Sequence, residues 1–158
     1  MDLPEDQTPK MVRKSLQGVY WESNPNYDYG TFHKQFYFFY GTLMDPSTLA
    51  TVLGLGNRPQ VFRAKVIGYH CMMWGQYPAL LDDPPGAAVY GVAYEVQSQG
   101  DSKRLEEYET DNYATSSCLI EFEDGRKVIG RTFKWNADKS LLREGSFDLK
   151  DWQMNKLG

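Results

Sequence analysis

Residues 36–53, FYFFYGTLMDPSTLATVL, contain the signals for a buried strand, a tight loop and the start of a helix. The aromatic run Phe36–Tyr40 is too short for a helix, and its residue types suit a strand that is buried on both faces. Gly41 follows this run, and a glycine there lets the backbone turn sharply and lets another group approach the main chain. A helix is predicted next, because Asp45 can cap it and Pro46 suits its first position.

The loop between this strand and helix has two interpretations. Amides from Gly41 to Leu43 would point toward a helix N-terminus, where an anion or a carboxylate can bind. The other interpretation is an ordinary strand-to-helix connection, which is the simpler one on the loop alone.

The composition predicts one domain with a substantial core. The chain has 158 residues, of which 11 are Tyr, 8 are Phe and 4 are Trp, and this length suits a single domain. A net charge of −4, with Lys and Arg scattered along the chain, argues against a nucleic-acid partner, because such a partner needs clustered positive charge.

No apolar run is long enough to span a bilayer, and the first twenty residues lack the apolar stretch of a secretory signal. We therefore expect a cytoplasmic protein that does not contact membranes. Cys71 and Cys118 lie in strand-like apolar patterns and are expected to be free, buried thiols. Together with His33 and His70 they show no ligand spacing for a metal site.

The chain divides into an N-terminal tail, residues 1–34, and a domain, residues 35–158. The tail is polar but carries several aromatic residues in its second half, so we expect that half to pack partly on the domain. Within the domain, residues 60–74 are predicted to form a long strand or a bent pair divided near Gly68. Residues 75–86 are predicted to form a loop, because they contain three prolines.

The remaining elements favour an α+β fold. A helix is predicted for residues 101–109 with Asp101 as its cap, and a hairpin for residues 118–135 with a two-residue turn at Asp124–Gly125. A last short helix should begin at Asp148. Residues 88–96 alternate as a strand whose face of small residues either borders a cavity or accommodates a bulky neighbour.

The segment RLEEYET, residues 104–110, offers three glutamates that could do acid–base chemistry. At about 100° per residue, Glu109 shares one side of a helix with Leu105 and Tyr108, whereas Glu107 lies opposite. Glu109 is thus the acid most readily carried inward, where an apolar setting raises the pKa of a carboxyl group. The alternative is a helix-end carboxylate that turns outward to water.

The stretch FFYGTLM resembles the opening of gamma-glutamylcyclotransferase-like proteins, particularly those of the plant avirulence-induced-gene branch. In that family the first strand runs into a YGS or YGT loop, matched here by Tyr40–Thr42. A later helix ends in a motif like LD-x-x-EG whose glutamate is the base, and Glu109 matches that glutamate.

Further similarities to this family extend the resemblance over residues 36–152. They are Tyr77–Pro78, Val89–Gly91, Lys134–Asn136 and Phe147–Trp152. Three features depart from the family pattern: Thr110 replaces the glycine after the presumed base, Tyr113–Thr115 replaces a Y-x-R sequence and lacks its arginine, and Glu106 replaces the aspartate of the helix motif.

The resemblance implies a small mixed β-barrel flanked by a few helices, and an acyltransferase that needs no metal and no cofactor. The implied partner is a small γ-glutamyl substrate, such as a peptide like glutathione or a γ-glutamyl amine, which cyclises to 5-oxoproline and releases its amine. Glu109 would be the general base. The implied substrate-binding residues are Tyr40, Gly41, Thr42, Leu43, Met44, Asp45, Tyr77 and Tyr113. Tyr77 and Tyr113 are the weaker candidates, because a tyrosine in such a position is more often simply a packed aromatic.

Two other classes of function are compatible with the sequence. One is a binding protein that keeps the pocket without turnover. The other is a stress-related interaction protein that uses the fold as a scaffold. The sequence specifies neither the released amine nor the oligomeric state.

Overall fold

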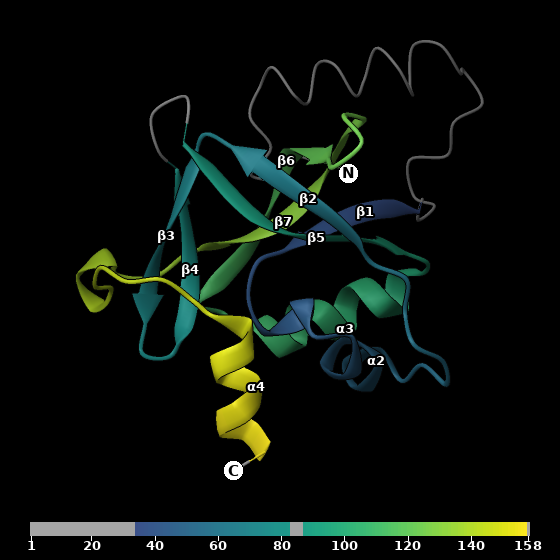
Figure 1. Cartoon of the computed structure of the whole chain (residues 1–158), viewed down its shortest axis with the longest axis horizontal. Helices are drawn as coiled ribbons and strands as arrows, with labels where there is room; N and C mark the ends of the chain where they lie inside the picture. The colour runs from purple at the N-terminus through teal and green to yellow at the C-terminus, as the bar shows by residue number, and fades with distance from the viewer. Residues whose placement is uncertain (1–33, 83–86, 158) are drawn as a thin grey trace.

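The structure, a computed structural model, describes residues 34–82 and 87–157. Nearly all of the predicted tail therefore lies outside the described residues. The main feature is a closed barrel with the strand order β1-β5-β2-β6-β7 (Figure 1). Its strands are β1 (Gln35–Phe39), β2 (Phe62–Ile67), β5 (Ala88–Val96), β6 (Tyr113–Phe122) and β7 (Lys127–Trp135). The pairs are antiparallel except for β1 and β7, which are parallel and close the barrel. The prediction of an α+β fold with a small mixed barrel is confirmed.

A two-stranded sheet lies beside the barrel and consists of β3 (Tyr69–Trp74) and β4 (Tyr77–Asp82) (Figure 1). The bent pair predicted for residues 60–74 is confirmed as β2 and β3, which are divided at Gly68 with its φ of +94°. The loop predicted for residues 75–86 is wrong where β4 forms. Met73 directs its amide and carbonyl to Arg143, so its partner Pro78 needs no N–H for the pairing.

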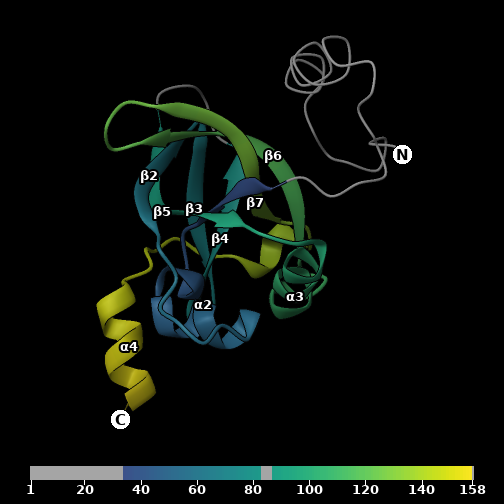
Figure 2. The same ribbon diagram turned by 90° about the vertical axis from the view of Figure 1, so that its right-hand side faces the viewer.

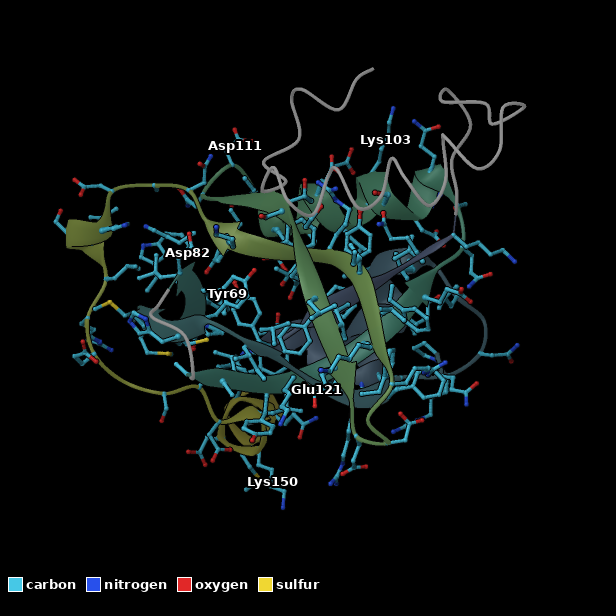
Figure 3. The ribbon with its side chains drawn as sticks, turned by 90° about the horizontal axis from the view of Figure 1, so that it is seen from above. Tyr69, Asp82, Lys103, Asp111, Glu121 and Lys150 are labelled. Carbon is cyan, nitrogen blue, oxygen red and sulfur yellow. The ribbon has the colours of Figure 1, made fainter. Side chains whose placement is uncertain are left out.

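Two helices cover one end of the barrel, α2 (Pro46–Leu53) and α3 (Gln99–Glu109), as both views show (Figures 1 and 2). Strand β1 supplies both core layers through its alternating side chains. Phe38 and Tyr40 lie in the barrel interior, whereas Tyr37 and Phe39 pack with the helices. The exposed side of α3 is polar, and Lys103 points from it into solvent (Figure 3).

The small face of β5 accommodates a bulky neighbour, and its Gly91 also lines a second cavity of about 530 Å³. A Cβ atom at Gly91 would lie 2.1 Å from the Phe39 carbonyl oxygen and 2.9 Å from Phe38 Cζ. The small residues of this strand therefore allow the aromatic strand β1 to pack closely in the barrel.

The helix starts agree with the sequence in two of three cases. Asp45 caps α2 by accepting from the Thr48 amide at 3.1 Å, and α4 (Leu149–Leu157) begins directly after Asp148. Asp101 is not the cap of α3, because Ser98 holds that position and accepts from the Asp101 amide. The helix therefore starts two residues earlier than predicted, at Gln99.

The predicted β6–β7 hairpin is confirmed, but its connection is longer than two residues. The Phe122 amide donates to the Arg126 carbonyl, and the Gly125 amide donates back to Phe122. This is a turn followed by a glycine with a φ of +93°. Short 3-10 helices η3 (Thr42–Met44) and η4 (Lys139–Leu141) complete the described elements.

Cys71 and Cys118 are free, as predicted, but only Cys118 is buried as expected, whereas Cys71 is partly exposed. None of the helices in the described part of the chain combines the length and apolar character needed to cross a membrane.

Candidate active site

A cavity of about 410 Å³ lies where the end of β1, the β3–β4 sheet and the last turn of α3 meet. Barrel closure brings β7 to the same place. The lining residues are Phe38, Phe39, Tyr40, Gly41, Thr42, Leu43, Trp74, Tyr77, Pro78, Tyr108, Glu109, Thr110, Asn112, Tyr113 and Phe133.

The loop after β1 lines this cavity with free backbone amides. Met44 and Asp45 donate their amides back to Gly41 and Thr42 in the η3 turn. Within residues 34–82 and 87–157, the amides of Gly41, Thr42 and Leu43 donate to no acceptor. Unbonded amides beside a cavity can bind the oxygen atoms of a ligand.

Gly41 is needed where this loop passes the β3–β4 sheet. A Cβ atom there would lie 3.0 Å from Pro78 Cγ and 3.3 Å from Pro78 Cδ. The glycine thus permits the close approach that the sequence predicted at this position, and the group that approaches is a proline ring.

Tyr40 joins the barrel to the β3–β4 sheet. Its buried hydroxyl donates to the Phe133 carbonyl and accepts from the Leu80 amide at 3.2 Å. Burial raises the pKa of Tyr40 well above its usual value, and the nearby Glu109 carboxylate raises it further. This tyrosine therefore remains protonated, and it holds together the two layers between which the cavity lies.

Glu109 ends α3 and carries the only carboxylate of the cavity lining in the described residues. Burial raises its pKa from 4.5 to about 7. In the same described ranges the carboxylate makes no hydrogen bond or ion pair. A partly buried, unpaired carboxylate with this pKa can accept and return a proton near neutral pH.

Thr110 directly follows Glu109 and has an unusual backbone conformation, with a φ of 66° and a ψ of −178°. This region is nearly exclusive to glycine, and a β-branched residue there is strained by about 1–3 kcal/mol. The conformation ends α3 and turns the chain toward β6. Strain is therefore stored beside the candidate base.

Two tyrosine hydroxyls fasten the cavity walls. Tyr108 Oη lies 2.7 Å from Thr42 Oγ1, and Tyr113 Oη donates to the Pro78 carbonyl at 2.8 Å. Burial raises the pKa of both tyrosines, and the Glu109 carboxylate contributes to both increases. Both side chains are thus neutral donors or acceptors at physiological pH.

Seven of the residues predicted for the site line one cavity: Tyr40, Gly41, Thr42, Leu43, Tyr77, Glu109 and Tyr113. Met44 and Asp45 do not line it. Met44 packs against the core between barrel and helices. Asp45 uses its carboxylate for Thr48 and for Gln153 Nε2, which lies 2.8 Å from it.

Sequence reasoning missed several lining residues. Trp74 and Pro78 belong to the β3–β4 sheet, half of which was predicted as a loop. Phe133 reaches the cavity through the closure of the barrel, which no local pattern indicates. Tyr108 had a usable signal, because it shares its helix side with Glu109.

The described residues contain no cluster of three or more His, Cys, Asp or Glu side chains that could hold a metal ion.

Comparison with known proteins identifies the family to which this chain belongs. The model of the family described as "Gamma-glutamyl cyclotransferase, AIG2-like" matches residues 37–154. The fold and cavity thus define a gamma-glutamylcyclotransferase-like domain, and the chain belongs to the AIG2-like gamma-glutamyl cyclotransferase family. No curated protein sequence matches the chain.

Solved structures with this fold come from plants, animals and fungi. A protein from Arabidopsis thaliana has a TM-score of 0.62 at 21% identity, over 80% of this chain and 85% of that one. An AIG2-like protein from Mus musculus has a TM-score of 0.54 at 22% identity, over 74% and 90% of the two chains. A gamma-glutamyl cyclotransferase specific to glutathione from yeast has a TM-score of 0.53 at 11% identity, over 66% and 69%. These identities support a shared fold and no more.

Proposed function

We propose that this protein cyclises a γ-glutamyl amine or peptide to 5-oxoproline and releases the amine without a cofactor. One observation carries this proposal: the Glu109 carboxylate, which has no bonding partner, and the unbonded amides of Gly41–Leu43 line the same cavity. Membership of the gamma-glutamyl cyclotransferase family supports the same reaction.

The reaction needs few groups because both reacting atoms belong to one molecule. The neutral α-amino nitrogen attacks the γ-carbonyl carbon, and the new C–N bond closes a five-membered ring. The tetrahedral intermediate then collapses, the bond to the amine breaks, and no water is consumed. Holding the glutamyl chain bent toward this geometry lowers the barrier, because the attack is intramolecular.

Glu109 is the general base in this scheme. Its carboxylate takes the proton from the attacking nitrogen and later gives it to the departing amine, so the residue is regenerated. A pKa of about 7 suits both steps near neutral pH.

The amides of Gly41–Leu43 bind the oxygen atoms of the glutamyl moiety, first of all its α-carboxylate. The amides of Met44 and Asp45 are already bonded within the η3 turn, so we restrict the binding loop to the first three residues. Tyr77 and Tyr113 form the wall around the rest of the substrate.

The test is 5-oxoproline release from a panel of γ-glutamyl substrates by the native protein and by Glu109→Gln. We expect this substitution to lower turnover by about 10²- to 10⁴-fold, the usual contribution of a general base. Glu107→Gln is the matched control, because Glu107 is an exposed residue of the same helix and should keep native turnover. Equal turnover in Glu109→Gln and the native protein would falsify the assignment.

A non-catalytic glutamyl-ligand-binding protein is the second candidate. It is favoured by one observation, the glycine-type conformation that Thr110 adopts next to Glu109, because strain there could displace the base. Ligand binding without product across the panel would select this candidate.

A further inference from the structure

We propose that the released amine carries an aromatic or apolar body and no carboxylate, so that the preferred substrates are γ-glutamyl arylalkylamines. This inference rests on the proposed function and specifies the substrate class of the same cavity.

The cavity offers one binding site for an anion. The amides of Gly41–Leu43 are its unbonded backbone donors, and the glutamyl α-carboxylate of any substrate would bind them. No Lys, Arg or His side chain of the described residues lines the cavity. A second carboxylate, such as that of a released amino acid or peptide, would therefore lose part of its hydration and gain only neutral donors such as the Asn112 side chain, with no cation to compensate.

Glu109 strengthens this discrimination. Its carboxylate lies in the same cavity and is itself poorly hydrated, as its raised pKa of about 7 indicates. A second anion on the substrate would be repelled by the ionised base, in a site where burial reduces screening.

Two cations near the β3–β4 sheet have partners elsewhere. Lys134 pairs with Asp82 at 2.9 Å, and Arg143 donates to the Gly75 carbonyl at 3.4 Å. Neither side chain belongs to the cavity lining.

Aromatic rings form the wall of the cavity beyond the proposed binding site of the glutamyl group. The Trp74 ring lies 6.5 Å from that of Tyr77 and 6.4 Å from that of Tyr113. Trp135 supports this wall from behind, at 5.2 Å from Trp74 and 5.4 Å from Tyr113. Rings held in such a cluster present a rigid apolar surface, on which another ring can pack in an edge-to-face or offset arrangement.

The wall is open toward solvent, since Tyr77 is 39% exposed and Tyr108 is 38% exposed. The departing amine can thus pack between exposed rings and leave without a large rearrangement. The volume of about 410 Å³ lies within the range of about 300–1,000 Å³ that is usual for small-molecule pockets.

The experiment compares three substrates that differ only in the leaving amine: γ-glutamyl methylamide, γ-glutamyl phenethylamide and γ-glutamyl phenylalanine. The last two differ by one carboxylate. We expect kcat/KM for the phenethylamide to exceed that for γ-glutamyl phenylalanine at least tenfold, and also to exceed that for the methylamide. Calorimetry with Glu109→Gln, which should bind without turnover, is expected to rank the affinities in the same order.

Two variants test whether residues of the cavity lining cause the preference for the leaving amine. Trp74→Leu should lower the ratio of phenethylamide to methylamide turnover, whereas Tyr90→Leu, at an exposed position outside this cavity, should leave the ratio as it is. Asn112→Arg places a cation in the lining and should shift the preference toward γ-glutamyl phenylalanine.

The failures can be told apart. If the methylamide yields 5-oxoproline but γ-glutamyl phenylalanine is processed as well as the phenethylamide, the inference is overturned and the proposed function stands. If none of the three substrates yields product, the proposed function falls. If Glu109→Gln then also binds γ-glutamyl phenylalanine as tightly as the phenethylamide, the substrate class falls with it.

Discussion

The hydroxyl oxygens of Thr42 and Tyr108 lie 2.7 Å apart, and this hydrogen bond joins the loop after β1 to the last turn of α3. Each residue is the direct neighbour of a group assigned to the reaction, because Thr42 lies in the amide loop and Tyr108 precedes Glu109. The bond therefore sets the position of the proposed base relative to the proposed binding loop.

Removing one hydroxyl from this pair should loosen the site without unfolding the protein. In Tyr108→Phe we expect KM to rise several-fold, because the amide loop and Glu109 are no longer tied together. A double-mutant cycle with Thr42→Val should give a coupling energy of about 1 kcal/mol, the usual size for a hydrogen bond. Tyr90→Phe, at a position that is 71% exposed, is the control. Additive effects of the two substitutions would show that the bond has no such role.

Activity should rise with pH through about 7. Burial raises the pKa of Glu109 to about 7, and only the ionised carboxylate can take a proton, so the active fraction grows as the pH increases past this value. The substrate's own α-amino group also titrates, usually near pH 8. The residual activity of Glu109→Gln measures that second titration alone. The prediction fails if the two pH profiles of kcat/KM have the same shape.

Glycine at position 110 should stabilise the fold. Thr110 has a φ of 66°, and Thr110→Gly removes strain of about 1–3 kcal/mol but increases the freedom of the unfolded chain. We expect the free energy of unfolding in urea to increase by about 1 kcal/mol. Thr51→Gly is the control, because Thr51 is an exposed residue inside α2, and the change there should lower stability by about 0.5 kcal/mol. A loss of stability in Thr110→Gly would argue that its backbone is unstrained.

The Tyr40 hydroxyl should matter more for stability than that of an exposed tyrosine. Tyr40→Phe leaves the Phe133 carbonyl and the Leu80 amide without their partner, and unsatisfied buried groups cost about 1–3 kcal/mol each. We expect a loss of about 2–3 kcal/mol and faster hydrogen exchange at the Leu80 amide. Tyr90→Phe should stay within about 0.5 kcal/mol of the native protein. Similar stability of the two variants would contradict the structure at Tyr40.

Local signals in the sequence were sufficient for much of the fold. Asp45 and Pro46 mark the start of α2, Gly68 marks the division of β2 from β3, and the burial of Leu105 beside Glu109 follows from the helical period. Each of these depends on neighbours within a few residues, and such short-range chemistry is readable from one sequence.

The parts that could not be predicted depend on distant contacts. Pro78 can lie in a strand because Met73, the residue opposite it, makes its backbone hydrogen bonds with Arg143 and needs no N–H from Pro78. No sequence pattern around Pro78 indicates this contact. The cavity has the same dependence, because Phe133 lies beside Tyr40 only after β7 has paired with β1. The family resemblance supplied what local patterns lacked, by associating Tyr40–Thr42 with Glu109.

The parallel pairing of β1 with β7 has a consequence for how the protein is made. Strand β1 is among the first parts of the domain to leave the ribosome, but its partner Arg131 on β7 is synthesised some ninety residues later. The aromatic run of β1 can pair with β5 once that strand is made, but the barrel closes only after β7 is available, and contacts so distant in sequence generally slow folding. Demand for chaperones during synthesis should accordingly last until the β1–β7 pair forms, at Phe36–Tyr40, the segment that leads into the candidate binding loop.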